Sequence, residues 1–142
     1  MSSLDHRLSK VSETLDRMHP SGLLYTTYEA RLLDQLDRSR LPQHVAVLAD
    51  GNRRWARLNA PGEPLVAGYE AGADRLREFC TWCDAVGTPI ITLWVLSTDN
   101  LQRAETGELG PLLKVIESLV DSLAANSRWR VQAVGDLDLL PG

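Results

Sequence analysis

Cysteine, histidine and long apolar segments are scarce in this sequence, and each scarcity excludes a class of protein. The three histidines, His6, His19 and His44, are scattered, so no zinc-ligand set can be assembled from sequence neighbours. The longest apolar runs contain only a handful of residues, far fewer than a membrane span requires. Residues 1–18 are rich in charge and contain no apolar signal segment, so we expect a cytoplasmic protein.

Basic residues are also fewer than acidic ones. Fifteen lysines and arginines against nineteen aspartates and glutamates give a formal net charge of −4, which argues against a general nucleic-acid-binding protein. Hydrophobic residues are 44% of the chain and charged residues 24%, values close to the globular average, so we expect a folded protein. A chain of 142 residues forms one domain of ordinary size, or part of a larger one, with a real core.

The two cysteines, Cys80 and Cys83, have the spacing of a redox-active pair. A reactive pair requires its first sulfur at the start of a helix, where the helix dipole lowers the pKa of the thiol. Here the pair lies well inside a helical pattern, and both residues fall on its apolar stripe. We therefore interpret both cysteines as buried packing residues.

Helical patterns precede the main body of the chain. Apolar residues recur at helical spacing over residues 4–18 and again over residues 25–36, and residues 38–42 make a polar stop. We expect residues 1–40 to form an N-terminal helical extension and residues 41–142 to form the main domain.

The main domain alternates strands with helices. Short continuous apolar runs at residues 45–49 and 90–96 are typical of strands buried on both faces, and residues 129–134 supply a third strand. Helical periodicity over residues 69–83 and 109–123 joins them. This order predicts an α/β fold with a parallel sheet of about three strands and flanking helices.

Polar residues cluster where the first two strands end. Residues 50–55 follow the first strand, and residues 97–103 follow the second. In parallel sheets, ligands bind beyond the carboxyl ends of the strands. We therefore expect the functional site at these two clusters.

The first cluster contains groups that suit a metal-bound diphosphate. The carboxylate of Asp50 can hold a hard cation such as Mg²⁺, and Gly51 permits a tight turn whose N–H groups converge on an anion. The guanidinium groups of Arg53 and Arg54 suit phosphate. The spacing also agrees with a plainer interpretation, in which Asp50 caps the following helix and the arginines are solvated.

The second cluster offers hydroxyls, a carboxylate, an amide and one further cation. Its members are Ser97, Thr98, Asp99, Asn100 and Arg103. The same residue types are typical of an ordinary strand-to-helix turn. The sequence contains no G-x-x-x-x-G-K-[ST] motif, so it does not predict a nucleotide P-loop.

The amino-acid sequence of both clusters resembles the signature of the cis-prenyltransferases, also called the undecaprenyl diphosphate synthase or isoprenyl transferase family. The first motif is H-V-A-V-L-A-D-G-N-R-R-W-A at residues 44–56, followed by G-Y-E-A-G-A at residues 68–73. The second is T-L-W-V-L-S-T-D-N-L-Q-R at residues 92–103, and V-G-D at residues 134–136 matches a weaker landmark. The variants look most like the short-chain actinobacterial Z-farnesyl diphosphate synthases.

The resemblance implies an Mg²⁺-dependent transferase. Its substrates would be isopentenyl diphosphate and an allylic diphosphate (geranyl or farnesyl diphosphate), and its product a short-chain cis (Z) polyprenyl diphosphate. By motif position, Asp50 would hold Mg²⁺ and help the diphosphate leave, and Asn100 occupies the position of the proton acceptor. An amide is a poor base, so we expect Asn100 to position a phosphate or water that takes the proton. The residues that the resemblance assigns to substrate binding are Gly51, Asn52, Arg53, Arg54, Trp55, Tyr69, Ser97, Thr98, Asp99 and Arg103.

The sequence departs from the family pattern at several positions. Tyr69 stands where a histidine is usual, Asp99 replaces a glutamate, and Ala104 replaces a proline. The family commonly has an arginine shortly before the glycine at position 68, whereas residues 58–74 contain none.

Members of the family are considerably longer than this chain. Their second half carries an arginine-rich motif for isopentenyl diphosphate, a metal-binding glutamate and most of a homodimer interface. We therefore expect residues 41–142 to form the first half of the fold, inactive alone. The resemblance also implies peripheral membrane contact through a lipid product. Two alternatives stay open: a non-catalytic subunit or remnant that folds with a complementary chain, and a simple diphosphate-binding module.

Overall fold

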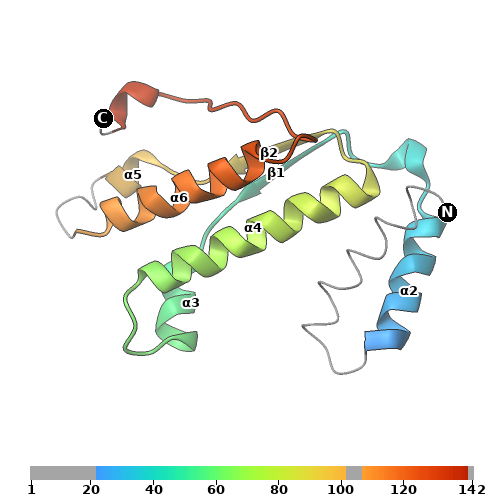
Figure 1. Ribbon diagram of the computed structural model, residues 1–142, viewed down its shortest axis with the longest axis horizontal. Coiled ribbons are helices and arrows are strands. Elements are labelled where there is room, and N and C mark those ends of the chain that lie inside the picture. Colours follow the sequence, from blue (N-terminus) through green and yellow to red (C-terminus); the bar gives the residue numbers. More distant parts are fainter. Residues whose placement is uncertain (1–21, 102–106, 141–142) are drawn as a thin grey trace. The chain divides into compact units, whose positions relative to one another are not determined.

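The computed structural model describes residues 22–101 and 107–140. The helix expected over residues 4–18 lies outside these described residues. In chain order the elements are α2 (Gly22–Gln35), the 3-10 helix η1 (Arg38–Arg40), β1 (His44–Leu48), α3 (Asn52–Asn59), α4 (Val66–Val86), β2 (Ile90–Trp94), α5 (Thr98–Leu101), α6 (Leu109–Ala124) and the 3-10 helix η3 (Leu137–Leu139) (Figure 1). None of the described helices combines the length and the apolar character needed to cross a bilayer.

Strands β1 and β2 pair in parallel, which confirms the predicted α/β class. The register runs from His44 opposite Ile90 to Leu48 opposite Trp94. The N–H of Ala49 extends the ladder by donating to the carbonyl oxygen of Trp94 at 3.3 Å. Because the strands run in the same direction and end level, the segments that carry the two polar clusters leave the same edge of the sheet.

The prediction of a third strand at residues 129–134 is wrong. Within the described residues the sheet has two strands, and residues 129–134 form no ladder with either of them. Val131 and Val134 are 40% and 87% exposed. An alternating apolar pattern shows that a segment suits a strand, but a strand also needs a partner for its backbone groups.

The prediction that the strands are buried on both faces is also wrong. Exposure alternates along β1 and β2, so one face is half-buried and the other is open. On the open face Leu48, Ile90 and Trp94 are 68%, 53% and 58% exposed. A continuous apolar run therefore does not indicate whether both faces of a strand are covered by other elements.

The described residues group into two compact units. The first contains those up to Ala49 together with Glu78–Trp94, and the second contains Asp50–Arg77 and those from Val95 onward. Helix α4 contributes its last part to the first unit and its first part to the second.

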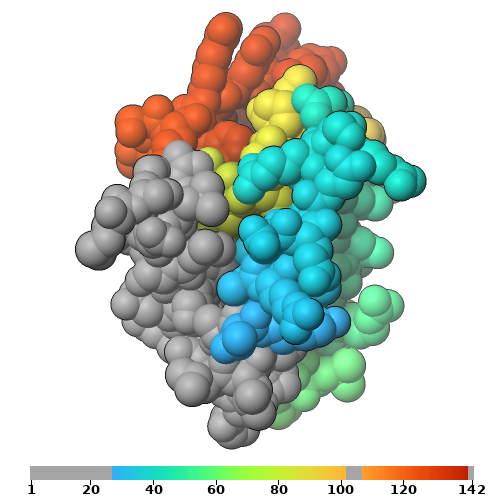
Figure 2. All heavy atoms as spheres, turned by 90° about the vertical axis from the view of Figure 1, so that its right-hand side faces the viewer, coloured from blue at the N-terminus to red at the C-terminus, as the bar shows by residue number. Residues whose placement is uncertain are grey.

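In the first unit, α2 confirms the helix predicted over residues 25–36. Its apolar positions stay accessible, because Tyr28 and Leu32 are 59% and 43% exposed. Figure 2 shows α2 and the residues that follow it, coloured blue to cyan, at the surface of the face in view.

The two cysteines in the last part of α4 are buried packing residues, as predicted. Both are free thiols with 5% exposure. Desolvation by burial, together with Coulomb repulsion from Cys83, raises the pKa of Cys80 to about 11. Burial also raises the pKa of Cys83. A redox-active pair needs the opposite shift, so the thiols are unsuited to that chemistry.

In the second unit, side-chain hydrogen bonds and close packing join α4 to α6 and to α3. The guanidinium of Arg77 on α4 donates to the hydroxyl oxygens of Ser118 and Ser122 on α6, at 3.3 and 2.9 Å. Between these elements the buried apolar residues are Ala56, Tyr69, Ala73, Leu76, Leu112 and Leu119. These contacts fix the start of α4, against which α3 lies (Figure 1).

Candidate functional site

The turn between β1 and α3 exposes the start of a helix. Gly51 is the N-cap residue of α3, with a positive φ of 87° that a residue without Cβ adopts readily. The N–H of Gly51 donates to Oδ1 of Asp50 at 2.6 Å, and no side chain caps α3. The plainer interpretation, in which Asp50 caps the helix, is therefore not what the chain adopts. The first N–H groups of α3 have no acceptor within the helix, which makes them suitable donors to an anion.

Two glycines of α4 allow α3 to approach its backbone closely. A Cβ added at Gly68 would overlap the carbonyl oxygen of Asn52, and one added at Gly72 would lie 2.5 Å from Oδ1 of the same asparagine. The first turn of α3 is therefore held directly against α4. A side chain at Gly68 would push the two helices apart, because it would meet the backbone of Asn52, whereas one at Gly72 would displace the Asn52 side chain.

A cavity of about 420 Å³ opens beside this contact. Five residues predicted from the first motif line it: Asp50, Gly51, Asn52, Arg54 and Trp55. The remaining lining residues were not predicted, and they are Leu58, Asn59, Gly68, Ala71, Gly72 and Arg75. The volume lies within the usual range for small-molecule sites.

The cavity combines cations with an apolar wall. Its charged lining residues are the carboxylate of Asp50 and the guanidinium groups of Arg54 and Arg75. The Arg54 guanidinium lies over Gly51, because a Cβ added at Gly51 would sit 3.2 Å from its Nη2. Trp55 and Leu58, which are 44% and 75% exposed, supply apolar surface. This lining suits a ligand that joins a multiply charged anion to a hydrocarbon.

Helical spacing was the signal that could have identified Arg75. Gly68, Gly72 and Arg75 are separated by four and three residues, so they share one face of α4. The structure places Gly68 and Gly72 beside the site. A residue seven positions after Gly68 lies on the same face of α4, two turns further along the helix.

Several residues of the predicted site do not line this cavity. Arg53 is exposed on α3, outside the lining. Tyr69 is buried, with 5% exposure, and its hydroxyl donates to Oε2 of Glu108 at 3.1 Å. Ser97, Thr98, Asp99 and Asn100 are absent from the lining, and Arg103 lies outside the described residues.

The second cluster forms a strand-to-helix turn, which the sequence also allowed. The N–H of Ser97 donates to Oδ1 of Asn100 at 2.9 Å, and the N–H of Asn100 donates to the carbonyl oxygen of Ser97 at 2.9 Å. Both residues are half-buried, whereas Thr98 and Asp99 are exposed. The side-chain oxygen of Asn100 thus stabilises the turn, and a neutral amide is a poor base.

The donor set fits a metal ion that shares its ligands with a substrate. Among residues 22–101 and 107–140, no three His, Cys, Asp or Glu side chains form a group able to hold a metal ion. Mg²⁺ commonly binds through one or two carboxylates together with substrate phosphates and waters. The exposed carboxylate of Asp50 at the cavity supplies one such ligand.

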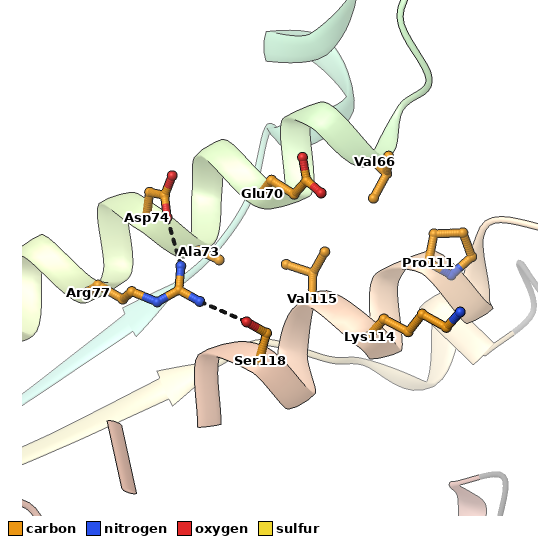
Figure 3. Close-up of a pocket in the computed structure, with 9 residues that line it drawn as sticks. All are labelled: Val66, Glu70, Ala73, Asp74, Arg77, Pro111, Lys114, Val115 and Ser118. Atoms are coloured by element: carbon orange, nitrogen blue, oxygen red, sulfur yellow. Dashed lines mark hydrogen bonds and ion pairs between the residues drawn. The ribbon is translucent and has the colours of Figure 1, made fainter. Parts of the chain in front are cut away.

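A second cavity, of about 500 Å³, lies between α4 and α6 and contains no predicted site residue (Figure 3). It is crossed by Arg77, which pairs with Asp74 at 2.7 Å and reaches Ser118. Its charged lining residues are two acids and two bases, namely Glu70, Asp74, Arg77 and Lys114. Because these charges offset one another, it lacks the excess positive charge that favours an anion.

Comparison with known proteins identifies the relatives of the chain. The model of the undecaprenyl diphosphate synthase family matches residues 48–142. The chain is 48% identical over 119 residues to isoprenyl transferase 1 of Streptomyces avermitilis, an alignment that covers 84% of the chain and 45% of the relative. It is 49% identical over 118 residues to the (2Z,6E)-farnesyl diphosphate synthase of Thermobifida fusca, covering 83% and 45%. It is 46% identical over 120 residues to the short-chain Z-isoprenyl diphosphate synthase of Mycobacterium leprae, covering 82% and 45%. The chain thus spans under half the length of these curated relatives.

Proposed function

The chain belongs to the undecaprenyl diphosphate synthase family, and we propose that it carries the allylic diphosphate site of an isoprenyl transferase. The reaction joins an allylic diphosphate to isopentenyl diphosphate and forms a cis (Z) prenyl diphosphate. The names of the relatives, which include two short-chain Z-type synthases, favour a short product. The observation that carries the proposal is the cavity in which Asp50, Arg54 and the start of α3 meet an apolar wall.

In this reaction the bond between the allylic carbon and the diphosphate oxygen breaks, and diphosphate leaves with the electron pair. A new carbon–carbon bond forms to isopentenyl diphosphate, which then loses a proton as the double bond forms. Negative charge therefore grows on the departing diphosphate, and stabilising that charge is the main task of the protein.

Different residues of the first motif contact the diphosphate and the hydrocarbon. The guanidinium of Arg54 and the N–H groups at the start of α3 donate to the diphosphate. Gly51 leaves the space in which the Arg54 guanidinium lies. Arg53, exposed on the same turn, is proposed to contact the phosphates from outside the cavity. Trp55 supplies an apolar surface for the hydrocarbon.

Asp50 is proposed to hold Mg²⁺ together with the substrate. When bound, this ion stabilises the charge on the diphosphate oxygens. The carboxylate accepts the N–H of Gly51 through Oδ1, which fixes its orientation at the mouth of the turn.

The second motif is proposed to complete the site. Ser97, Thr98 and Asp99 would bind substrate from the turn that Asn100 holds in place, and Arg103 would add a cation. Tyr69 is proposed to act indirectly, because its hydroxyl is directed to Glu108 in the interior. In place of a base, Asn100 would orient the phosphate or water that accepts the proton.

The remaining proposals concern location, assembly and the bounds of the domain. We propose a cytoplasmic enzyme that forms a homodimer and contacts a membrane peripherally through its lipid product. Residues 41–142 would form the transferase domain, and the family match to residues 48–142 supports that assignment.

The open face of the sheet favours a second candidate function, that of a subunit assembled with a complementary chain. Leu48, Ile90 and Trp94 together present an apolar surface of the kind that marks interaction sites. This candidate predicts poor stability alone and a gain on co-expression with a full-length relative. A monomeric chain with a sharp cooperative thermal transition would exclude it.

Calorimetric titration with geranyl diphosphate tests the proposed function. With Mg²⁺ present, we expect Asp50→Asn to weaken binding by about tenfold or more, because the substitution removes the charge that holds the ion. With EDTA, the same variant should bind as tightly as the wild type or more tightly, because the carboxylate then only repels the ligand.

Asp138→Asn is the matched control, because Asp138 is an exposed aspartate on η3, outside the cavity. Equal weakening by both substitutions, or no binding by the wild type, would reject the proposal. Incorporation of labelled isopentenyl diphosphate into a Z-configured product would extend it from binding to complete transfer.

A further inference from the structure

Resting on the proposed function, we propose that Arg75 of α4 is a second diphosphate-binding residue, which makes the cavity selective for a diphosphate over a monophosphate. Arg75 lines the cavity with Asp50 and Arg54, although it lies outside the motif that names them. The proposal assigns a role to a residue of the second helix at the site.

The position of Arg75 directs its side chain to the contact between α3 and α4. Helical side chains lean toward the N-terminus of their helix, over the preceding turn. For Arg75 that turn contains Ala71 and Gly72, both of which line the cavity. The side chain of Asn52 occupies the space over Gly72, so this glycine brings the first turn of α3 close to the face of α4 that carries Arg75.

Arg75 makes the cavity lining positively charged on balance. The carboxylate of Asp50 offsets the charge of Arg54, so these two residues alone leave the lining with no excess charge. Arg75 supplies the excess positive charge among the charged lining residues. Residues 58–74 contain no arginine, so Arg75 is the first arginine of α4 able to do so.

Two guanidinium groups on separate helices suit a ligand with two phosphates. Each guanidinium can present a fork of N–H donors to one phosphate, a geometry that a lysine ammonium does not reproduce. Arg54 extends from α3 and Arg75 from α4, so a monophosphate would engage one of them and a diphosphate both. Arg75 also takes part in an interaction within the chain, which a bound phosphate would share or replace.

The test compares geranyl diphosphate with geranyl monophosphate as ligands of the 142-residue chain in calorimetric titrations with Mg²⁺. We expect Arg75→Gln to weaken diphosphate binding by about tenfold, the loss typical of one charge-assisted hydrogen-bonding group. Its monophosphate affinity should change by less than about twofold, so the preference for diphosphate falls. Arg75→Lys should retain part of that preference, because the charge stays and the fork is lost.

Arg57→Gln is the matched control. Arg57 is an exposed arginine on α3 that does not line the cavity, and its removal changes the net charge equally. If Arg75→Gln binds both ligands like Arg57→Gln, while Arg54→Gln loses diphosphate binding, the role of Arg75 is refuted and the proposed function stands. If the wild-type chain binds neither ligand, both proposals are rejected. Circular dichroism spectra that match the wild type show that each variant is folded.

Discussion

The close approach of α3 to α4 predicts that Gly68→Ala destabilises the chain, against the ordinary effect of this substitution. In a helix interior, alanine is favoured over glycine by about 1 kcal/mol. Here the added methyl group would overlap the carbonyl oxygen of Asn52 and lie 2.9 Å from its carbonyl carbon and 3.0 Å from the Cβ of Ala56. The obstructing atoms belong mainly to the backbone, which cannot rotate away as a flexible side chain does.

Relief of this overlap requires α3 to move away from α4. Inserting a methyl group into a packed contact costs about 1–3 kcal/mol, and separation of the helices adds the loss of their packing. We therefore expect a net loss of about 2 kcal/mol in the free energy of unfolding, measured by urea denaturation with tryptophan fluorescence. Because Asn52 also lines the cavity, binding of geranyl diphosphate should weaken as well.

Gly110→Ala is the control for Gly68→Ala. Gly110 lies in α6, and a Cβ added there meets no atom within 4 Å outside its chain neighbours. Its free energy of unfolding should stay unchanged or rise by up to about 1 kcal/mol, because alanine is favoured over glycine in a helix. A Gly68→Ala variant as stable as the wild type, or more stable, would refute the contact between α3 and α4 on which the shape of the cavity depends.

Two further predictions concern the second motif and the cysteines. Asn100→Ala should lower the free energy of unfolding by about 1 kcal/mol, because the N–H of Ser97 loses its acceptor. Asn100→Asp keeps an acceptor and should retain most of that stability; equal losses in urea denaturation would contradict the role in the turn. Stability should fall as pH rises from about 9 through about 11, because the thiol of Cys80 ionises in the unfolded chain before it does in the folded one. Urea denaturation at pH 8 and pH 10 measures this loss of stability, and Cys80→Ala should reduce it. An equal loss between the two pH values in Cys80→Ala and in the wild type would contradict the assignment to Cys80.

The sequence predicted features that depend on short stretches of chain. The helix period over residues 69–83 and 109–123 identified α4 and α6, and it placed Cys80 and Cys83 on a buried stripe. The abrupt change from apolar to polar residues at position 50 identified the start of the site. Each of these signals is local, because it depends on side-chain alternation or on turn chemistry within a few residues.

The sequence did not predict features that depend on distant residues. Residues 129–134 have the composition of a strand, but pairing depends on backbone groups elsewhere in the chain. The open face of β1 and β2 depends on what covers the sheet. The direction of the Tyr69 hydroxyl depends on Glu108, which is 39 residues away in the sequence.

The sequence alone therefore determined the parallel pair of strands, the main helices and five residues of the cavity lining, namely Asp50, Gly51, Asn52, Arg54 and Trp55. Only the tertiary structure brought Arg75 to the same cavity, excluded Tyr69 from it and showed why Gly68 and Gly72 carry no side chain. The physical reason is that a motif specifies which groups a short segment presents. The close packing of two helices decides which groups from the rest of the chain stand opposite them.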